Sequence, residues 1–147
     1  MAVQVVKGNL LHAPVDVIGH QVNCKGVMGA GIAKQLRSKY IGLYDHYRLY
    51  LASTPRPLGT VSLYHEQGKP LVANIYGQDG YGRHGVHTDY NALESALWEL
   101  AHIANTHGMS VGLPYGIGCG LAGGDWNIVL PMIEDIFQDV NCYLYRI

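Results

Sequence analysis

Short runs of β-branched residues alternate along the chain with longer segments of helical period, and this alternation constrains the fold more than any other feature. The runs typical of strands lie at 3–6, 15–22, 60–64, 71–76, 110–113 and 142–147. Apolar stripes with helical spacing lie at 31–40, 43–51, 93–103 and 129–137. The order β-β-α-α-β-β-α-β-α-β predicts an α/β protein, a three-layer α/β/α sandwich with a mixed sheet of about six strands.

Local signals refine these elements. The turn at 66–69 predicts that the third and fourth strands form a hairpin. Thr88 is a candidate cap for the third helix, and Gly108 lies just past its end. Pro131 lies near the expected start of the last helix and predicts an irregular first turn there.

Length and charge limit the possible classes of protein. The 147 residues suit a single domain spanning 1–147, and 48% apolar residues with 14% charged is a globular composition. Ten Lys and Arg against eleven Asp and Glu give a net charge of −1. This balance argues against a protein that holds nucleic acid mainly by neutralising phosphates.

The three cysteines, Cys24, Cys119 and Cys142, have no CxxC spacing, which favours free thiols in a reducing compartment. The first residues, MAVQVVKGNLL, lack the basic start and apolar core of a signal peptide, and no apolar run approaches 18 residues. We therefore expect a cytoplasmic protein that does not enter a membrane.

The 19 glycines are concentrated in a few loops, and two of these loops each lead from a strand toward a helix. The first glycine loop, residues 23–32, reads NCKGVMGAGI, and the second glycine loop, residues 116–124, reads GIGCGLAGG. Glycines let a ligand approach the backbone without meeting a Cβ atom, and the free N–H groups at a helix start favour an anion. Neither loop has the Gly-Lys-Ser/Thr of a Walker A motif or the spacing of the dinucleotide fingerprint. Two such loops at the carboxyl edge of one sheet predict a diphosphate clamp built from backbone amides.

At these residues the chain resembles a macrodomain of the Appr-1″-p processing family. The motifs are KGNL at 7–10, HQVNC at 20–24 leading into VMGAGIA at 27–33, and GIGCGL at 116–121 followed by Asp125-Trp126. The resemblance covers nearly the whole chain. It points to the short, stand-alone branch that includes ADP-ribose 1″-phosphate phosphatases and terminal ADP-ribose glycohydrolases.

The resemblance implies a binding site for ADP-ribose. It implies that adenine lies near Asn9, where the family usually has Asp, and near Tyr145. It also implies that the distal ribose lies near Asn23 and that the diphosphate lies on the two loops. The implied binding residues are Asn9, Leu10, Gly29, Ala30, Gly31, Ile32, Gly116, Ile117, Gly118, Cys119, Gly120, Leu121 and Tyr145.

The chain departs from the glycohydrolase pattern at two positions. Those enzymes have a lysine at the end of the fourth strand and an aspartate just after Gly-Cys-Gly-Leu. Here the first region, 74–78, reads NIYGQ, and the second position is Ala122. Phosphatase-type members have a His followed closely by an Asn in the second strand, and His20 and Asn23 fit that pattern.

Three residues are candidates for catalysis, each with a structural alternative. Asn23 orients the ribose or water, or it caps a loop. His20 handles a proton because its ordinary pKa lies near neutrality, or it is a hydrogen-bonded histidine at the sheet margin. Asp125 activates water, or it is a helix N-cap.

Other candidates are weaker. Arg83 is placed to meet a terminal phosphate or is a solvated charge. His84 and His87 have His-x-x-His spacing but no third ligand, so no metal is implied. Cys24 and Cys119 are expected to pack as small apolar groups.

We therefore expect hydrolysis of a group from the distal ribose, either a 1″-phosphate or an ester-linked acyl group or protein carboxylate, without a cofactor. The expected partners are an ADP-ribose derivative and ADP-ribosylated protein; a membrane is excluded and nucleic acid is not favoured. Two alternatives remain open: a non-catalytic module that reads ADP-ribose, and a domain for another nucleotide.

Overall fold

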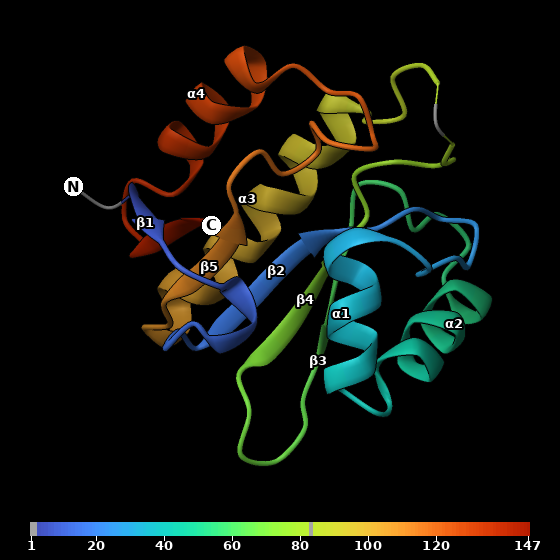
Figure 1. The fold of residues 1–147 in the computed structure, drawn as a ribbon, viewed down its shortest axis with the longest axis horizontal. Coiled ribbons are helices and arrows are strands. Elements are labelled where there is room, and N and C mark those ends of the chain that lie inside the picture. Colours follow the sequence, from blue (N-terminus) through green and yellow to red (C-terminus); the bar gives the residue numbers. More distant parts are fainter. Residues whose placement is uncertain (1–2, 83) are drawn as a thin grey trace.

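The computed structural model describes residues 3–82 and 84–147, and its centre is one six-stranded sheet (Figure 1). The strands lie in the order β1-β6-β5-β2-β4-β3. Their bounds are β1 Val3–Lys7, β2 Val17–Gln21, β3 Val61–Tyr64, β4 Leu71–Ile75, β5 Val111–Pro114 and β6 Cys142–Arg146. The helices are α1 Gly31–Lys39, α2 Leu43–Ser53, α3 Tyr90–His107 and α4 Trp126–Ile136, with a short 3-10 turn at Leu10–His12. The predicted mixed sheet of about six strands is confirmed.

Five strands are parallel, and only β3 runs antiparallel, as the partner of β4 in the predicted hairpin. The carboxyl ends of β1, β6, β5, β2 and β4 therefore share one edge of the sheet. In open α/β sheets this edge carries the ligand site.

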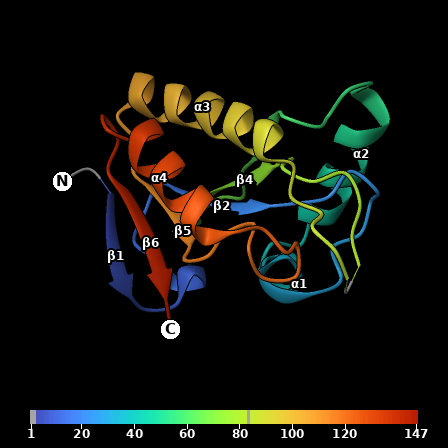
Figure 2. The same cartoon turned by 90° about the horizontal axis from the view of Figure 1, so that it is seen from above.

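Helices cover both faces of the sheet, as Figure 2 shows from above. Because side chains alternate along a strand, neighbouring residues of β2 enter different cores. Val17 packs with α3 and α4, whereas Ile18 packs with α1 and α2. The second core is rich in tyrosine: Tyr40, Tyr47 and Tyr76 are all fully buried there.

Three predicted details are corrected. The second strand begins at Val17 rather than at residue 15. The side chain of Asp89, not Thr88, caps α3 by accepting from the N–H of Ala92 at 3.0 Å. The last helix begins at Trp126, about one turn before the expected start, and continues through Pro131. Asp125 supplies its cap and so places the start upstream of the apolar stripe.

The predicted end of α3 just before Gly108 is confirmed, and Gly108 adopts a left-handed conformation with φ of 63°. Among the described residues, no helix is long and apolar enough to cross a membrane.

Candidate functional site

The two glycine loops leave adjacent parallel strands at the same edge. The first follows β2 and the second follows β5, and these strands pair with Val17 opposite Val111 and Ile18 opposite Gly112. Figure 1 shows the first loop, in blue, leading into α1 and the second, in orange, leading toward α4. The predicted placement of both loops at the carboxyl edge is confirmed.

Asn23 organises the first glycine loop from inside. Its side-chain oxygen accepts from the N–H groups of Lys25 at 2.9 Å and Val27 at 3.4 Å, and its Nδ2 donates to the carbonyl of Val27 at 2.8 Å. The residue is buried. The contacts are those of a loop-capping amide, which was the structural alternative for this position.

Two tyrosines of α2 attach the first glycine loop to the helix beneath it. The Tyr47 hydroxyl lies 2.7 Å from both the backbone and side-chain oxygens of Asn23, and it accepts from the N–H of Gly26 at 3.1 Å. The Tyr44 hydroxyl donates to the carbonyl of Gly26 at 2.9 Å. Burial raises the pKa of Tyr47 to about 12, so its hydroxyl keeps its proton at neutral pH.

The second glycine loop is attached to the sheet through Gln21 and Thr88. Gln21 Nε2 donates to the hydroxyl of Thr88 at 2.9 Å, and that hydroxyl donates to the carbonyl of Gly118 at 2.6 Å. Gly118 has a φ of 78°, and a Cβ there would lie 3.1 Å from Gln21 Oε1. The end of β2 thus fixes both loops. The first loop continues directly from β2, and the second is held through the side chain of Gln21, the last residue of β2.

Several glycines of the two loops face open space. An added Cβ would meet no other atom within 4 Å at Gly31, Gly116 or Gly120, and at Gly29 only Val27 at 4.0 Å. Gly123 and Gly124 differ, because a Cβ at either would lie 2.5 Å from a backbone oxygen. The open positions leave the backbone accessible to a ligand, and the closed ones set the shape of the second loop.

The segment after β4, described over 78–82 and 84–88, contacts both loops. The carbonyl of Asp79 accepts from the N–H of Cys24 at 3.0 Å, and the carbonyl of Ala122 accepts from the N–H of His87 at 2.7 Å. The Asp79 carboxylate also pairs with Lys25 at 3.1 Å. Arg83 lies outside the described residues, so its predicted contact with a phosphate has no structural description.

His20 is a buried residue of β2, directly before Gln21. It is fully buried, and its Nε2 is 2.7 Å from the side-chain oxygen of Asn74 on β4. Burial lowers its pKa to about 4. A neutral, enclosed imidazole does not support the proton-transfer role predicted for this residue.

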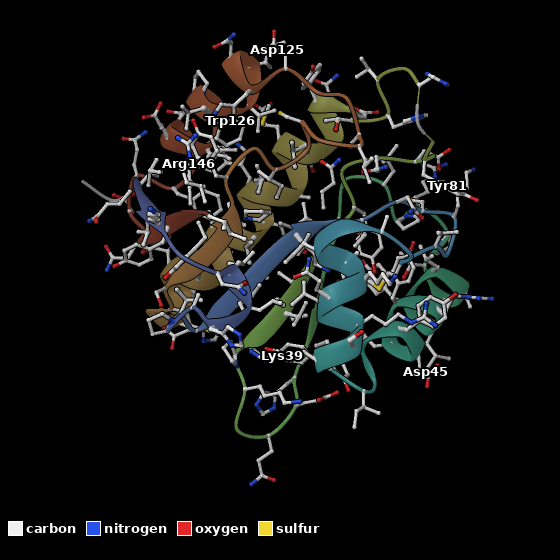
Figure 3. The ribbon with its side chains drawn as sticks, viewed as in Figure 1. Lys39, Asp45, Tyr81, Asp125, Trp126 and Arg146 are labelled. Carbon is white, nitrogen blue, oxygen red and sulfur yellow. The ribbon has the colours of Figure 1, made fainter. Side chains whose placement is uncertain are left out.

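Asp125 is the N-cap of α4. Its side chain accepts from the N–H of Asn127 at 2.9 Å, and its own N–H donates to the Tyr90 hydroxyl at 2.9 Å. Figure 3 places Asp125 and Trp126 at the top of the α3–α4 side and Tyr81 on the segment after β4, well to one side. These contacts are those of a helix N-cap, which was the structural alternative for Asp125.

The residues predicted to hold adenine lie near the ends of β1 and β6. Leu10 is buried, and both Leu10 and Tyr145 pack around Gly112 of β5. Asn9 is exposed, and its side-chain oxygen caps the 3-10 turn by accepting from the N–H of Leu11 at 3.0 Å. This cluster is separated from β2 by β5, so it lies beyond the second glycine loop along the same sheet edge.

The remaining predicted binding residues divide between surface and core. Ala30 and Leu121 are exposed, Ile32 and Cys119 are half-buried, and Ile117 is buried. Burial raises the pKa of the Cys24 thiol to about 11, and it also raises that of Cys119. Both thiols are therefore protonated at neutral pH, which does not favour a nucleophilic role.

A cavity of about 670 Å³ opens at the opposite edge of the sheet, lined in part by Asp16, His65 and Met109. It lies at the amino ends of β2, β4 and β5. The two glycine loops follow parallel strands at the carboxyl edge of the sheet, and their open glycines lie there. We therefore place the site at the carboxyl edge. No group of three or more His, Cys, Asp or Glu suited to a metal occurs within 3–82 and 84–147.

No family model matches the chain. It is 29% identical over 140 residues to a DNA ADP-ribosyl glycohydrolase of Thermus aquaticus, which covers 90% of this chain and 37% of that protein. It is 27% identical over 146 residues to human ADP-ribose glycohydrolase OARD1, covering 97% of this chain and 90% of OARD1. A macrodomain protein of Streptomyces coelicolor superposes with a TM-score of 0.82 at 27% identity, over 99% of both chains. The chain has the macrodomain fold. It spans little more than a third of the length of the Thermus relative.

Gln78 and Ala122 lie in the two regions of this macrodomain that depart from the glycohydrolase pattern, and both make structural contacts. Gln78 accepts from Gln21 Nε2 at 2.9 Å and donates to the carbonyl of Gly80 at 2.7 Å. Ala122 is buried and uses its carbonyl to hold the segment after β4.

Sequence reasoning missed the side chains that hold the macrodomain's loops: Tyr44, Tyr47, Gln21 and the hydroxyl of Thr88. Tyr44 and Tyr47 lie three residues apart, about one turn of α2, and neither was assigned a role from the sequence. Their spacing of three was a usable signal, but nothing in the sequence linked it to residue 26.

Proposed function

We propose that this macrodomain binds ADP-ribose at the carboxyl edge of its sheet and hydrolyses a bond at the distal ribose. The observation that carries the proposal is the pair of glycine loops on adjacent strands, with open space over Gly29, Gly31, Gly116 and Gly120. Backbone N–H groups suit a diphosphate without lysines. The named glycohydrolase relatives support the same general class of ligand and reaction.

In this arrangement the diphosphate lies on the two loops, adenine lies toward Asn9, Leu10 and Tyr145, and the distal ribose lies beside the first loop. Asn23 acts by holding the backbone donors of that loop in place. Fixed orientation of the ribose supplies a large part of the rate enhancement, because it places the scissile bond against a water.

Asp79 is the carboxylate that we propose as proton acceptor. It lies at the junction of the first glycine loop and the segment after β4, next to Lys25. The carboxylate takes a proton from water, the water oxygen bonds to the ribose carbon or to the acyl or phosphoryl centre attached to it, and the bond to the leaving group breaks. Lys25 forms an ion pair with the Asp79 carboxylate at 3.1 Å.

The test compares Asp79→Asn with Asp125→Asn, on ADP-ribose 1″-phosphate, acetyl-ADP-ribose and glutamate-linked ADP-ribose. We expect Asp79→Asn to lose at least 100-fold in turnover of one of these substrates while retaining ADP-ribose affinity, consistent with the usual contribution of a general base. Asp125→Asn is expected to keep its turnover. Unchanged turnover in Asp79→Asn would remove the assigned role.

A non-catalytic reader of ADP-ribose is the second candidate, favoured by the absence of a lysine from 74–78 and by Ala122 at the position where glycohydrolases have aspartate. Saturable ADP-ribose binding by the wild type without any product from the three substrates would select it.

A further inference from the structure

A stacked arginine lies between the proposed adenine and diphosphate contacts. Arg146 directly follows Tyr145 in the chain, and Tyr115 directly precedes Gly116 of the second glycine loop. The guanidinium carbon of Arg146 lies 4.4 Å from the centre of the Tyr115 ring. The adenosine ribose joins adenine to the diphosphate, so in the proposed binding mode it lies beside this contact.

Backbone hydrogen bonds hold the contact at the carboxyl edge of the sheet. The N–H of Tyr115 donates to the carbonyl of Tyr145 at 2.9 Å, and the N–H of Gly8 donates to the carbonyl of Arg146 at 2.9 Å. The Tyr115 ring also packs against Trp126, the first residue of α4, with ring centres 5.0 Å apart. Figure 3 shows Arg146 and Trp126 on the same side of the molecule. The Tyr115 ring therefore has a fixed position, against which the guanidinium group packs.

A second cation lies next to Arg146. Lys7, the last residue of β1, is opposite Arg146 in the parallel pair of β1 with β6. Opposite residues of neighbouring strands point to the same face of a sheet, and Leu144, two residues before Arg146, packs in the core with α3 and α4. Both cations are exposed on that face, and neither forms an ion pair with a carboxylate in the described part of the chain.

These two charges are isolated from the other cations of the chain. Residues 84–145 contain seven Asp and Glu and no Lys or Arg, and Lys25 in the first glycine loop is already paired with Asp79. Dinucleotide sites that take a free 2′-hydroxyl on the adenosine ribose use a carboxylate, whereas an arginine accommodates a 2′-phosphate. Unpaired positive charge at this point therefore favours a phosphorylated ribose.

We propose that Arg146 and Lys7 form a subsite for a phosphoryl group on the 2′-hydroxyl of the adenosine ribose, so that the protein prefers ADP-ribose 2′-phosphate to ADP-ribose. The inference rests on the proposed function and deepens it, because it names the form of the ligand. Stacking on Tyr115 restricts the guanidinium group and leaves its N–H groups free to donate to phosphoryl oxygens in pairs. Lys7 adds a point charge beside it.

The two faces of the sheet edge divide the ligand between them. Leu10 and Tyr145 pack with α1 and α2, whereas Arg146 and Lys7 lie on the α3–α4 face. Adenine lies on the first face and the phosphoryl group on the second, with the ribose across the strand ends. Strands β5 and β2 separate this subsite from the segment after β4, which carries the proposed proton acceptor Asp79. The phosphoryl group therefore contributes to binding and not to the chemical step.

Calorimetric titration with ADP-ribose, ADP-ribose 2′-phosphate and ADP-ribose 3′-phosphate measures the preference. We expect the wild type to bind the 2′-phosphate about tenfold more tightly than ADP-ribose, the effect of one or two hydrogen bonds to a charged group. The advantage should shrink as salt is added, because the cations are exposed. An equal gain from the 3′-phosphate would overturn the assignment of the subsite to the 2′ position.

Substitutions separate the subsite from the rest of the binding site. Arg146→Gln should remove most of the advantage of the 2′-phosphate while ADP-ribose is still bound with the affinity of the wild type. Arg146→Lys keeps the charge without the planar group and should retain part of the advantage, and Lys7→Gln should lose less than Arg146→Gln. Arg56→Gln is the matched control and should keep the full advantage, because Arg56 is an exposed arginine between α2 and β3, at the other end of the sheet.

Equal affinity of the wild type for ADP-ribose and its 2′-phosphate would overturn the inference while leaving ADP-ribose binding intact. So would an advantage that survives in Arg146→Gln/Lys7→Gln. An equal loss of affinity for both ligands in Arg146→Gln would also overturn it, because the residue would then only support the second glycine loop. Failure of the wild type to bind either ligand would instead overturn the proposed function, and with it this inference.

Discussion

Single hydroxyl groups and amides decide the shape of the candidate site. The first glycine loop has few side chains of its own, and its conformation depends on Asn23 and on the two tyrosines beneath it. Backbone donors can receive a diphosphate only if they are held in one arrangement before the ligand arrives. We therefore regard these buried polar contacts as part of the site even though they do not face it.

Tyr47→Phe tests this dependence. The variant keeps the ring in the core but removes hydrogen bonds to Asn23 and Gly26, so we expect a loss of about 1–2 kcal/mol in the free energy of unfolding. We also expect ADP-ribose affinity to fall about tenfold, because the first loop loses its anchor. Calorimetric titration and urea unfolding measure the two effects.

Tyr50→Phe is the matched control. Tyr50 is also in α2 and its hydroxyl is also hydrogen-bonded, but to Thr60 at 2.7 Å, away from the loop. Tyr50→Phe should lower the free energy of unfolding and leave the affinity for ADP-ribose unchanged. Unchanged affinity in Tyr47→Phe, or an equal loss in Tyr50→Phe, would contradict a specific dependence of ligand binding on the contacts of Tyr47 with the first loop.

At the scale of the elements, the sheet has no room for a side chain at Gly19. Gly19 on β2 lies between β4 and β5, and an added Cβ would come within 2.6 Å of Leu113 and 3.1 Å of Ile75. Both neighbours are fully buried. The packing of α3 against the sheet therefore depends on the absence of a side chain at this position.

Gly19→Ala should lower the free energy of unfolding by about 1–3 kcal/mol, because the core must shift to admit one methyl group. Gly120→Ala adds the same group where nothing lies within 4 Å and should leave stability unchanged. Chemical unfolding of both proteins measures the difference. A Gly19→Ala protein as stable as the wild type would mean that the centre of the sheet is less tightly packed than described.

The elements were predictable from sequence where the apolar pattern was regular. The stripe of Leu93, Leu97 and Leu100 located α3, and the β-branched runs located the strands. The start of α4 was missed because Trp126 and Asn127 precede the apolar stripe, and a cap at Asp125 extends the helix beyond it. The contacts that hold the loops could not be predicted, because Tyr47 and Gly26 are 21 residues apart and meet only in the fold.

At the scale of the whole molecule, the buried polar residues of the central strands link folding to pH. His20 is enclosed beneath α1 and α2, and its partner is the uncharged Asn74. Among residues 3–82 and 84–147, no carboxylate forms an ion pair with the His20 ring. Protonation of His20 therefore favours the unfolded chain.

The expected pH dependence follows from the two pKa values. Burial lowers the pKa of His20 from 6.5 in the unfolded chain to about 4 in the folded protein. Between these values the unfolded chain binds more protons, so stability is complete above pH 6.5 and falls as the pH drops toward 4. The loss attributable to His20 is roughly 3 kcal/mol.

Urea unfolding at pH 7 and pH 4.5 measures this loss, and His20→Gln should remove most of the difference between the two pH values. The quantity compared is the change in the free energy of unfolding between the two pH values, because His20→Gln itself changes that free energy at both pH values. An identical pH dependence in the two proteins would mean that other groups cause the acid destabilisation.

The account as a whole depends on ligand contact with the open backbone of the two glycine loops, and calorimetric titration of ADP-ribose into the wild type and Gly120→Ala tests it most directly. We predict saturable one-to-one binding by the wild type and at least tenfold weaker binding by Gly120→Ala, with the free energy of unfolding unchanged. Equal affinity in the two proteins, or no binding by the wild type, would contradict the central claim.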